Sequence, residues 1–281
     1  MPERTLPLLD PDARLVIGHR GASAEAPENT LAAFRRAAEL GVDGFELDVR
    51  VTADGVAVVI HDPQLERTTD GAGAVAASPL ARLRELDAGA RFTTDGGRTF
   101  PWRGRGVRVP TLDEVLAAFP AMPLIIEVKV PEAQAAVRDA LLRHAATARC
   151  VVCAIPHAAI AAFQRPPFLR GASRRDIARL WLGSHVSIAS AARDCLCFAV
   201  PVHHRRLHVT TDRFLAAARR LSRPVHVWTV DDPAEAASLW ARGVSGILTN
   251  TPGAMPPAGE RPAPHSSTAT SAPNGNRIPR E

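Results

Sequence analysis

The sequence has no apolar run long enough to cross a bilayer, because no stretch of its 281 residues stays apolar for the roughly 20 positions that a spanning helix needs. Its N-terminus, MPERTLPLLDPDARLVIGHRG, also lacks a positively charged segment that leads into an apolar run and a small-residue cleavage site. We therefore expect a cytoplasmic protein that does not insert stably into membranes.

Charges of one sign are not gathered into runs. The formal net charge is +5 and the pI is about 9.8, but basic residues are interspersed with acidic ones, and no block of five like charges occurs. Such blocks are typical of tails that bind nucleic acids. We expect no nucleic-acid partner, and the sequence indicates no particular oligomeric state.

Cysteine is scarce, with four residues at positions 150, 153, 195 and 197. The pairs CVVC and CLC could be taken for half-sites of a zinc cluster. Both lie in apolar runs typical of strands, where Cys150 and Cys153 point to opposite faces. This geometry favours buried small hydrophobic side chains, and we expect neither a disulfide nor a metal there.

Lysine is nearly absent, because Lys129 is the only one among 34 basic residues. The bias that replaced lysine by arginine elsewhere did not act at this position. An ammonium is a compact point charge, whereas a guanidinium is a wide planar fork, so a cramped site for a metal and a phosphate could require lysine. The alternative is the chance survival of one lysine.

Short apolar runs alternate with helical patterns along the chain, which is typical of a parallel sheet covered by helices. The expected strands cover residues 15–18, 43–49, 123–129, 150–154, 167–170, 195–200, 225–230 and 245–249. Helical patterns lie near residues 30–40, 111–119, 132–146, 157–164, 173–182, 210–221 and 233–242. The chain is 46% hydrophobic and can fill one large core, and a single barrel takes about 250 residues. The pattern predicts an α/β fold, a (β/α)8 TIM barrel.

The chain divides into three parts around this barrel. Residues 1–14 form an N-terminal extension, and the barrel is expected over 15–253. Residues 50–110 are too long for a simple connection and hold an expected strand and a short helix, so we predict a small insertion after the second strand. Residues 254–281 contain six of the 24 prolines and a run rich in Ser, Thr, Asn and Gly, so we expect a disordered tail.

Acidic side chains two positions apart occur near the ends of two expected strands, as Glu46 and Asp48 in ELDV and as Glu127 beside Lys129 in IIEVK. Alternate residues of a strand share a face, so these side chains converge on one mouth of the barrel. Burying an unpaired charge costs roughly several kcal/mol per ion, so the cluster needs either a metal or mutual pairing. Carboxylate oxygens suit Ca²⁺ or Mg²⁺ rather than zinc. A buried salt-bridge network without a catalytic task is the alternative.

Two histidines and an arginine follow expected strands directly. His19 and Arg20 come after the first strand, and His61 follows the strand of the insertion. A lone histidine is more often structural than catalytic. Barrel enzymes, however, place their chemistry at the carboxyl ends of the strands, where the carboxylate cluster also lies. These three residues are therefore candidate functional groups.

The series HRG, ENT, ELDV, TADG and HD, followed by PTLDEVL, IIEVK, VHVWTVDDP and GVSGILTNTP, resembles the glycerophosphodiester phosphodiesterase family over about residues 16–252. The resemblance implies a (β/α)8 barrel with a small insertion after the second strand. It implies metal-dependent hydrolysis of a glycerophosphodiester to an alcohol and glycerol 3-phosphate.

The same resemblance implies roles for single residues. Glu46, Asp48 and Glu127 would ligate one divalent cation, Ca²⁺ or Mg²⁺. The general acid and base would be His19 and His61, and the assignment of each stays open. The remaining implied groups contact the substrate, with Arg20 and Lys129 on the phosphate and Trp228 beside the alcohol portion.

Two positions depart from the family pattern. Asn250 in GILTN stands where the family usually has an aspartate, and CAIPH replaces a Ser-Phe-Asp run after the fourth strand. Both bear on substrate detail more than on catalysis. Two other functions stay open: cleavage of intact phospholipids by a related barrel, and binding of a phosphorylated ligand without turnover. The expected partner is a small glycerophosphodiester substrate.

Overall fold

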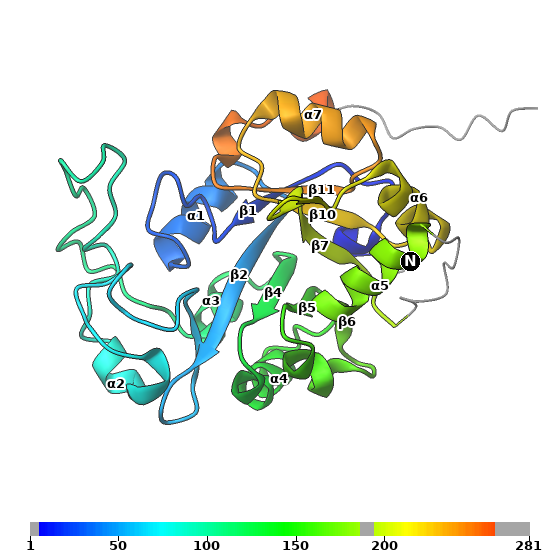
Figure 1. Cartoon of the computed structure of the whole chain (residues 1–281). Coiled ribbons are helices and arrows are strands. Elements are labelled where there is room, and N and C mark those ends of the chain that lie inside the picture. Colours follow the sequence, from blue (N-terminus) through cyan, green and yellow to red (C-terminus); the bar gives the residue numbers. More distant parts are fainter. Residues whose placement is uncertain (1–5, 186–193, 262–281) are drawn as a thin grey trace, which may run out of the picture.

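The computed structural model describes residues 6–185 and 194–261. Its centre is a barrel of eight parallel strands with helices around the outside, as Figure 1 shows. The barrel strands are β1 (Leu15–His19), β2 (Gly44–Val51), β4 (Leu124–Val128), β5 (Cys150–Ala154), β6 (Leu169–Ser173), β7 (Phe198–Pro201), β10 (Val225–Trp228) and β11 (Gly246–Thr249). The predicted α/β barrel is therefore confirmed.

Strand pairing runs in the order β6-β5-β4-β2-β1-β11-β10-β7. The two ends of this series meet, because the Leu196 N–H donates to the Arg170 carbonyl at 2.8 Å and the Ala172 N–H donates to the Cys197 carbonyl at 2.9 Å. β6 lies two to three residues later than expected. Its sequence, LRGAS, carries small residues in place of the apolar ones on which the expectation relied.

The outer layer consists of α1 (Leu31–Glu39), α3 (Leu112–Ala118), α4 (Gln134–Arg143), α5 (Arg174–His185), α6 (Asp212–Arg220) and α7 (Pro233–Ala241). A 3-10 helix, η4 (His157–Phe163), replaces the α-helix expected after β5. Side chains of Thr30, Thr111, Thr211 and Asp232 cap their helices by accepting a backbone N–H. None of the described helices combines the length and apolar character needed to span a membrane.

The cysteines follow the expected alternation of faces. Cys150 and Cys195 belong to the core between strands and helices, whereas Cys153 and Cys197 belong to the barrel interior. All four are buried and free of disulfides. Burial raises the pKa of the Cys150 thiol to about 12. These residues therefore pack as small apolar side chains.

The N-terminal extension closes the amino end of the barrel. The 3-10 helix η1 (Pro7–Leu9) places Leu8, which is fully buried, among interior residues such as Ile17 and Leu248. The buried ring of His226 lies with Nε2 2.9 Å from the Leu8 carbonyl oxygen. The N-terminal extension therefore plugs the barrel at this end.

The insertion leaves the barrel after β2 and lies to one side of it (Figure 1). It begins with β3 (Ala57–Val59), which pairs antiparallel with β2, and continues through η2 (Val75–Ala77) and α2 (Leu80–Leu83). A small core of its own includes Leu65 and Leu83. The first residues after β3 thereby return to the mouth of the barrel.

The folded part extends further than the expected boundary at residue 253. Met255 is buried in the main core, and the Arg261 guanidinium donates to the Arg14 carbonyl at 2.7 Å and to Asp43 at 2.5 Å. The composition of the segment gave no indication that Met255 would join the core or that Arg261 would form an ion pair. The rest of the expected tail, 262–281, lies outside the described residues.

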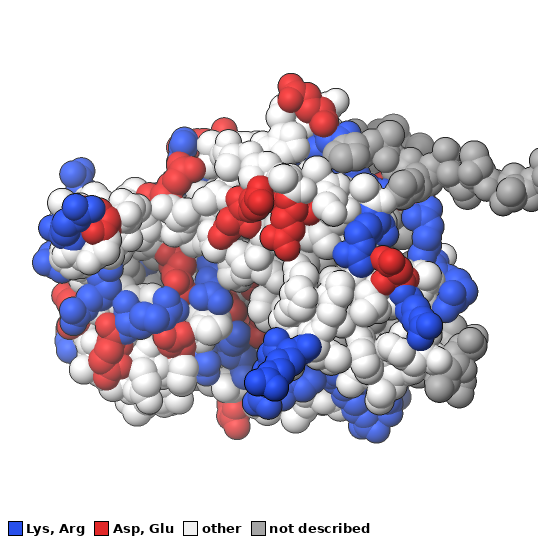
Figure 2. All heavy atoms as spheres, turned by 45° about the horizontal axis from the view of Figure 1, so that its top comes forward, with Lys and Arg blue, Asp and Glu red and all other residues white. Residues whose placement is uncertain are grey.

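Surface charge differs between the two sides of the barrel. In Figure 2, acidic and basic side chains interleave over the insertion, while the side of α5 and α6 is mostly basic. Exposed arginines of these two helices are Arg174, Arg175, Arg179, Arg213, Arg219 and Arg220. Much of the excess positive charge therefore lies away from the insertion.

Candidate active site

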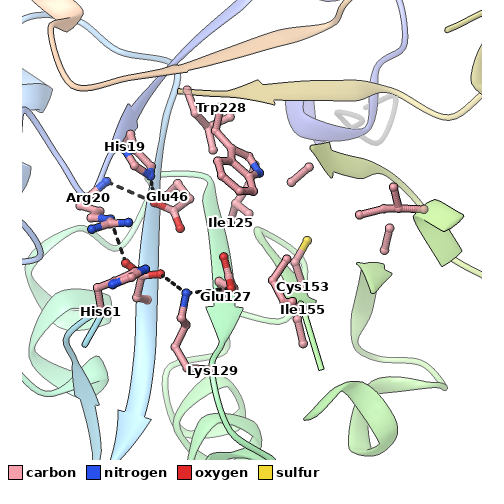
Figure 3. Close-up of a pocket in the computed structure, with 16 residues that line it drawn as sticks. His19, Arg20, Glu46, His61, Ile125, Glu127, Lys129, Cys153, Ile155 and Trp228 are labelled. Atoms are coloured by element: carbon pink, nitrogen blue, oxygen red, sulfur yellow. Dashed lines mark hydrogen bonds and ion pairs between the residues drawn. The ribbon is translucent and has the colours of Figure 1, made fainter. Parts of the chain in front are cut away.

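A cavity of about 110 Å³ opens at the carboxyl ends of the barrel strands. Figure 3 shows charged side chains from β1, β2 and β4 on one side and apolar side chains such as Ile155 on the other. Trp228, the last residue of β10, lines the same cavity. All eight residues singled out from the sequence line this one cavity: His19, Arg20, Glu46, Asp48, His61, Glu127, Lys129 and Trp228.

Three carboxylates meet where β2 and β4 lie side by side. Asp48 is the direct register partner of Glu127, and Glu46 precedes Asp48 by two positions on the same face. One oxygen from each carboxylate lies within 4.8 Å of the other two. Glu46 is 4% and Asp48 1% exposed, so water screens their repulsion weakly.

Glu46 is surrounded by more negative than positive charge. Burial and the nearby charges of Asp48 and Glu127 raise the pKa of Glu46 well above its ordinary range. Burial alone would also raise the pKa of Asp48, but Lys129 and Arg20 lower it below its ordinary value. Glu46 therefore favours an additional cation, and oxygen donors this close together fit a hard divalent ion.

Lys129 and Arg20 lie against the same carboxylates. The Lys129 Nζ is 2.9 Å from Glu127 Oε1 and 3.2 Å from Asp48 Oδ1. The Arg20 Nε is 3.1 Å from the other Asp48 oxygen, Oδ2. Burial would lower the pKa of Lys129, but the two carboxylates raise it above the ordinary value. Both side chains are therefore cationic at the wall of the cavity.

His19 is oriented by Asn250, the residue that follows β11. This departure from the family pattern therefore contacts a candidate catalytic residue, whereas we expected it to bear on substrate detail. The Asn250 amide nitrogen donates to Asp231 Oδ2 at 2.9 Å, so its oxygen faces His19 Nδ1 at 2.8 Å and accepts from the Ser23 hydroxyl at 2.7 Å. An oxygen acceptor requires the proton on Nδ1 and leaves Nε2 facing the cluster, 3.9 Å from Glu46. Burial and the charge of Arg20 lower the pKa of His19.

His61 has a different partner from His19. Its Nδ1 lies 2.5 Å from Asp62 Oδ1, and its carbonyl accepts from Arg50 Nε at 2.7 Å. A charged carboxylate therefore holds one imidazole of the site and a neutral amide holds the other. Sequence reasoning gave Asp62 no role, and its place next to His61 in the motif HD was the available signal.

The loop after β1 supplies two residues to which sequence reasoning gave no role. Asn29 Nδ2 donates to Asp48 Oδ2 at 2.9 Å, and Glu28 accepts from Arg20 Nη1 at 2.8 Å. Both belong to the motif ENT. Its occurrence in the quoted series was the signal that could have drawn attention to them.

A sequence model of the glycerophosphoryl diester phosphodiesterase family matches residues 19–254. An uncharacterized protein of Mycobacterium tuberculosis is 36% identical over 178 residues, which cover 62% of this chain and 59% of that protein. A glycerophosphodiester phosphodiesterase of Caldanaerobacter subterraneus is 47% identical over 116 residues, which cover 41% of this chain and 44% of that protein. The chain thus matches about half the length of these two relatives.

Solved structures share the architecture. A phosphodiesterase of Oleispira antarctica in complex with the product sn-glycerol-3-phosphate is 27% identical with a TM-score of 0.70, over 85% of this chain and 94% of that one. A glycerophosphodiester phosphodiesterase of Agrobacterium tumefaciens is 28% identical with a TM-score of 0.67, over 85% of this chain and 97% of that one. Because the family match covers residues 19–254, well over half of the chain, the chain belongs to the glycerophosphoryl diester phosphodiesterase family.

Proposed function

We propose that the chain hydrolyses a glycerophosphodiester to an alcohol and glycerol 3-phosphate with the help of a divalent cation. The observation that carries this proposal is the convergence of three carboxylates, two histidines and two cationic side chains at one cavity. The Oleispira antarctica relative, with sn-glycerol-3-phosphate bound as product, supports the choice of product.

Glu46, Asp48 and Glu127 would hold the cation, which we propose to be Ca²⁺ or Mg²⁺. Their donor set is oxygen only, and the raised pKa of Glu46 indicates a site short of positive charge. When bound, such a cation neutralises charge that develops on the phosphoryl oxygens during hydrolysis.

Arg20 and Lys129 would bind the anionic phosphodiester. Both are cationic, buried for the most part and fixed by carboxylates that leave little freedom of movement. Preorganised positive charge next to the reacting phosphorus stabilises the transition state more than the substrate. The guanidinium and the ammonium thereby add to the effect of the cation.

We propose that His19 is the general base and His61 the general acid. His19 carries its proton on Nδ1 towards Asn250, so the Nε2 lone pair faces the cavity and can accept a proton from water. His61 is held by Asp62 as in catalytic histidine–carboxylate pairs, in which the carboxylate stabilises the imidazolium that gives its proton to the leaving group. The leaving alkoxide would take that proton.

Trp228 would contact the alcohol portion of the substrate. Together with Ile125, Ile155 and Ile177 it gives the cavity an apolar wall opposite the charged side chains. The substrate phosphate would thereby contact the charged side chains, and an uncharged part of the substrate would contact the apolar wall.

The test is release of free glycerol 3-phosphate from glycerophosphocholine, measured with Mg²⁺ or Ca²⁺ and with excess chelator. We expect turnover that depends on the cation. Release of diacylglycerol or phosphatidate from intact phospholipid vesicles, without turnover of glycerophosphocholine, would instead indicate a phospholipid-cleaving enzyme. Binding of glycerol 3-phosphate without turnover of either substrate would indicate a non-catalytic barrel.

A further inference from the structure

Arg67, in the insertion, lies between two carboxylates and binds both with its planar fork. Its Nε and Nη2 face the two oxygens of Asp62 at 2.5 and 3.2 Å. Its Nη1 and Nη2 face the two oxygens of Glu28 at 2.7 and 2.8 Å. One guanidinium thus makes bidentate contacts with two acids that are 34 residues apart in sequence.

Each of these carboxylates also holds a side chain of the active site. Asp62 Oδ1 lies 2.5 Å from His61 Nδ1, and Glu28 Oε1 accepts from Arg20 Nη1 at 2.8 Å. A continuous chain of charged contacts therefore runs from His61 through Asp62, Arg67 and Glu28 to Arg20. It joins His61, two residues after the end of β3 in the insertion, to Arg20, which directly follows β1 of the barrel.

Negative and positive groups alternate along this series of contacts. The hydrogen bond from Arg67 is the largest cause of a pKa of Asp62 far below its usual range. Burial would raise the pKa of Glu28, but hydrogen bonds from Arg67 and Arg20 lower it. Both acids are therefore ionised and ready to hold a donor on their other side. Without Arg67, two negative groups would face each other across the space that it fills.

We propose that Arg67 is a positioning residue of the active site, which holds His61 and Arg20 in register with each other through Asp62 and Glu28. It does not touch the cavity that would take the substrate phosphate, so its effect is exerted through its two partners. This inference rests on the proposed function, in which His61 and Arg20 act on the substrate. It also gives the insertion a task, because the insertion delivers Arg67 to the mouth of the barrel.

A role in folding alone predicts a different outcome. The Arg67 side chain is 46% exposed, and exposed ion pairs contribute little to stability. Loss of Arg67 should therefore change the melting temperature little and the rate strongly. If the residue merely stabilised the insertion, the two effects would appear together.

The first experiment compares Arg67→Met and Arg67→Lys with the parent on glycerophosphocholine. We expect Arg67→Met to lower kcat/KM by about 10- to 100-fold, the usual effect of displaced catalytic groups, with a near-parental melting temperature. Arg67→Lys should recover only a small part of the loss, because an ammonium cannot span four carboxylate oxygens as a fork does. The matched control is Arg82→Met, which removes another ion-paired arginine of the insertion and should leave kcat/KM unchanged.

A double-mutant cycle shows whether Arg67 acts through its partners. Asp62→Asn and Glu28→Gln should each lower kcat/KM. Arg67→Met should then lower kcat/KM much less in either of these variants than it does in the unmutated protein. Full additivity, complete recovery by Arg67→Lys, or parental kcat/KM in Arg67→Met would each overturn the proposal.

A spectroscopic measurement keeps this inference separate from the proposed function. In protein labelled with ¹⁵N-histidine, with the His61 signals assigned from His61→Ala, the ring nitrogen shifts of His61 should change in Arg67→Met and stay unchanged in Arg82→Met. If the unmutated protein had no phosphodiesterase activity but these shifts still changed, the proposed function would be refuted and the positioning role of Arg67 would stand. If the unmutated protein were active and Arg67→Met had the same His61 signals and the same rates, only the positioning role of Arg67 would be refuted.

Discussion

Glu46→Gln should move metal affinity and metal-free stability in opposite directions. The change keeps the shape of the side chain and removes one negative charge from a cluster whose oxygens lie within 4.8 Å of one another. At this distance, and at an effective dielectric constant of about 20, two like charges repel by about 3.5 kcal/mol. Glu46 faces two such neighbours, and the cations Arg20 and Lys129 offset part of the repulsion.

We expect a net gain of about 1–3 kcal/mol in the free energy of unfolding of the metal-free protein, which corresponds to a rise in melting temperature of roughly 3–10 °C. Divalent affinity should fall by at least about 100-fold, because even residues that only support a ligand cost 10- to 100-fold. Turnover should fall with it, and excess metal should restore part of the rate.

Thermal unfolding in excess chelator and calorimetric titration with Mg²⁺ or Ca²⁺ measure the two effects on the same samples. Glu85→Gln, which removes an exposed carboxylate from an ion pair of the insertion, is the matched control and should change neither quantity. A lower metal-free melting temperature together with unchanged metal affinity would show that Glu46 is a structural partner of Arg20 and not part of a cation site.

Further predictions concern the histidines and the C-terminal segment. His19→Ala and His61→Ala should each lower turnover by about 10²–10⁴. With a p-nitrophenyl phosphodiester, whose leaving group needs no proton, His61→Ala should recover most of its rate and His19→Ala should not; the reverse pattern would exchange the two roles. Burial lowers the pKa of His226 to about 4, below the ordinary 6.5. Between these pH values the unfolded chain binds more protons than the folded one, so the free energy of unfolding should fall by about 3 kcal/mol as the pH drops from 6.5 to 4. Acid titration of the melting temperature tests this, and His226→Gln, which can still donate to the Leu8 carbonyl, should lose most of this dependence. A chain that ends before residue 254 should melt several degrees lower than one that ends at Arg261, because only the longer chain keeps Met255 in the core and the Arg261–Asp43 ion pair. Equal melting temperatures would contradict this.

The sequence by itself determined the local elements of the barrel. Strand and helix patterns were placed within a few residues, because apolar periodicity and turn residues act over short stretches of chain. The same period of two put Glu46 and Asp48 on one face, and Glu127 with Lys129 on another strand end. The recognised motif series then indicated which residues belong to the site, without saying how they touch.

Only the tertiary structure decided the contacts that join distant segments. Asp48 stands opposite Glu127 because of strand register, which the separate sequences of β2 and β4 do not contain. Asn250 reaches His19 across 231 positions, and Arg67 reaches Glu28 across 39, because closure of the barrel and the path of the insertion bring them together. The C-terminal segment likewise docks through single anchors, Met255 and Arg261, that its composition conceals. Hydrogen bonds and ion pairs act over a few ångströms of space, whatever the separation along the chain, so their partners are fixed only once the chain has folded.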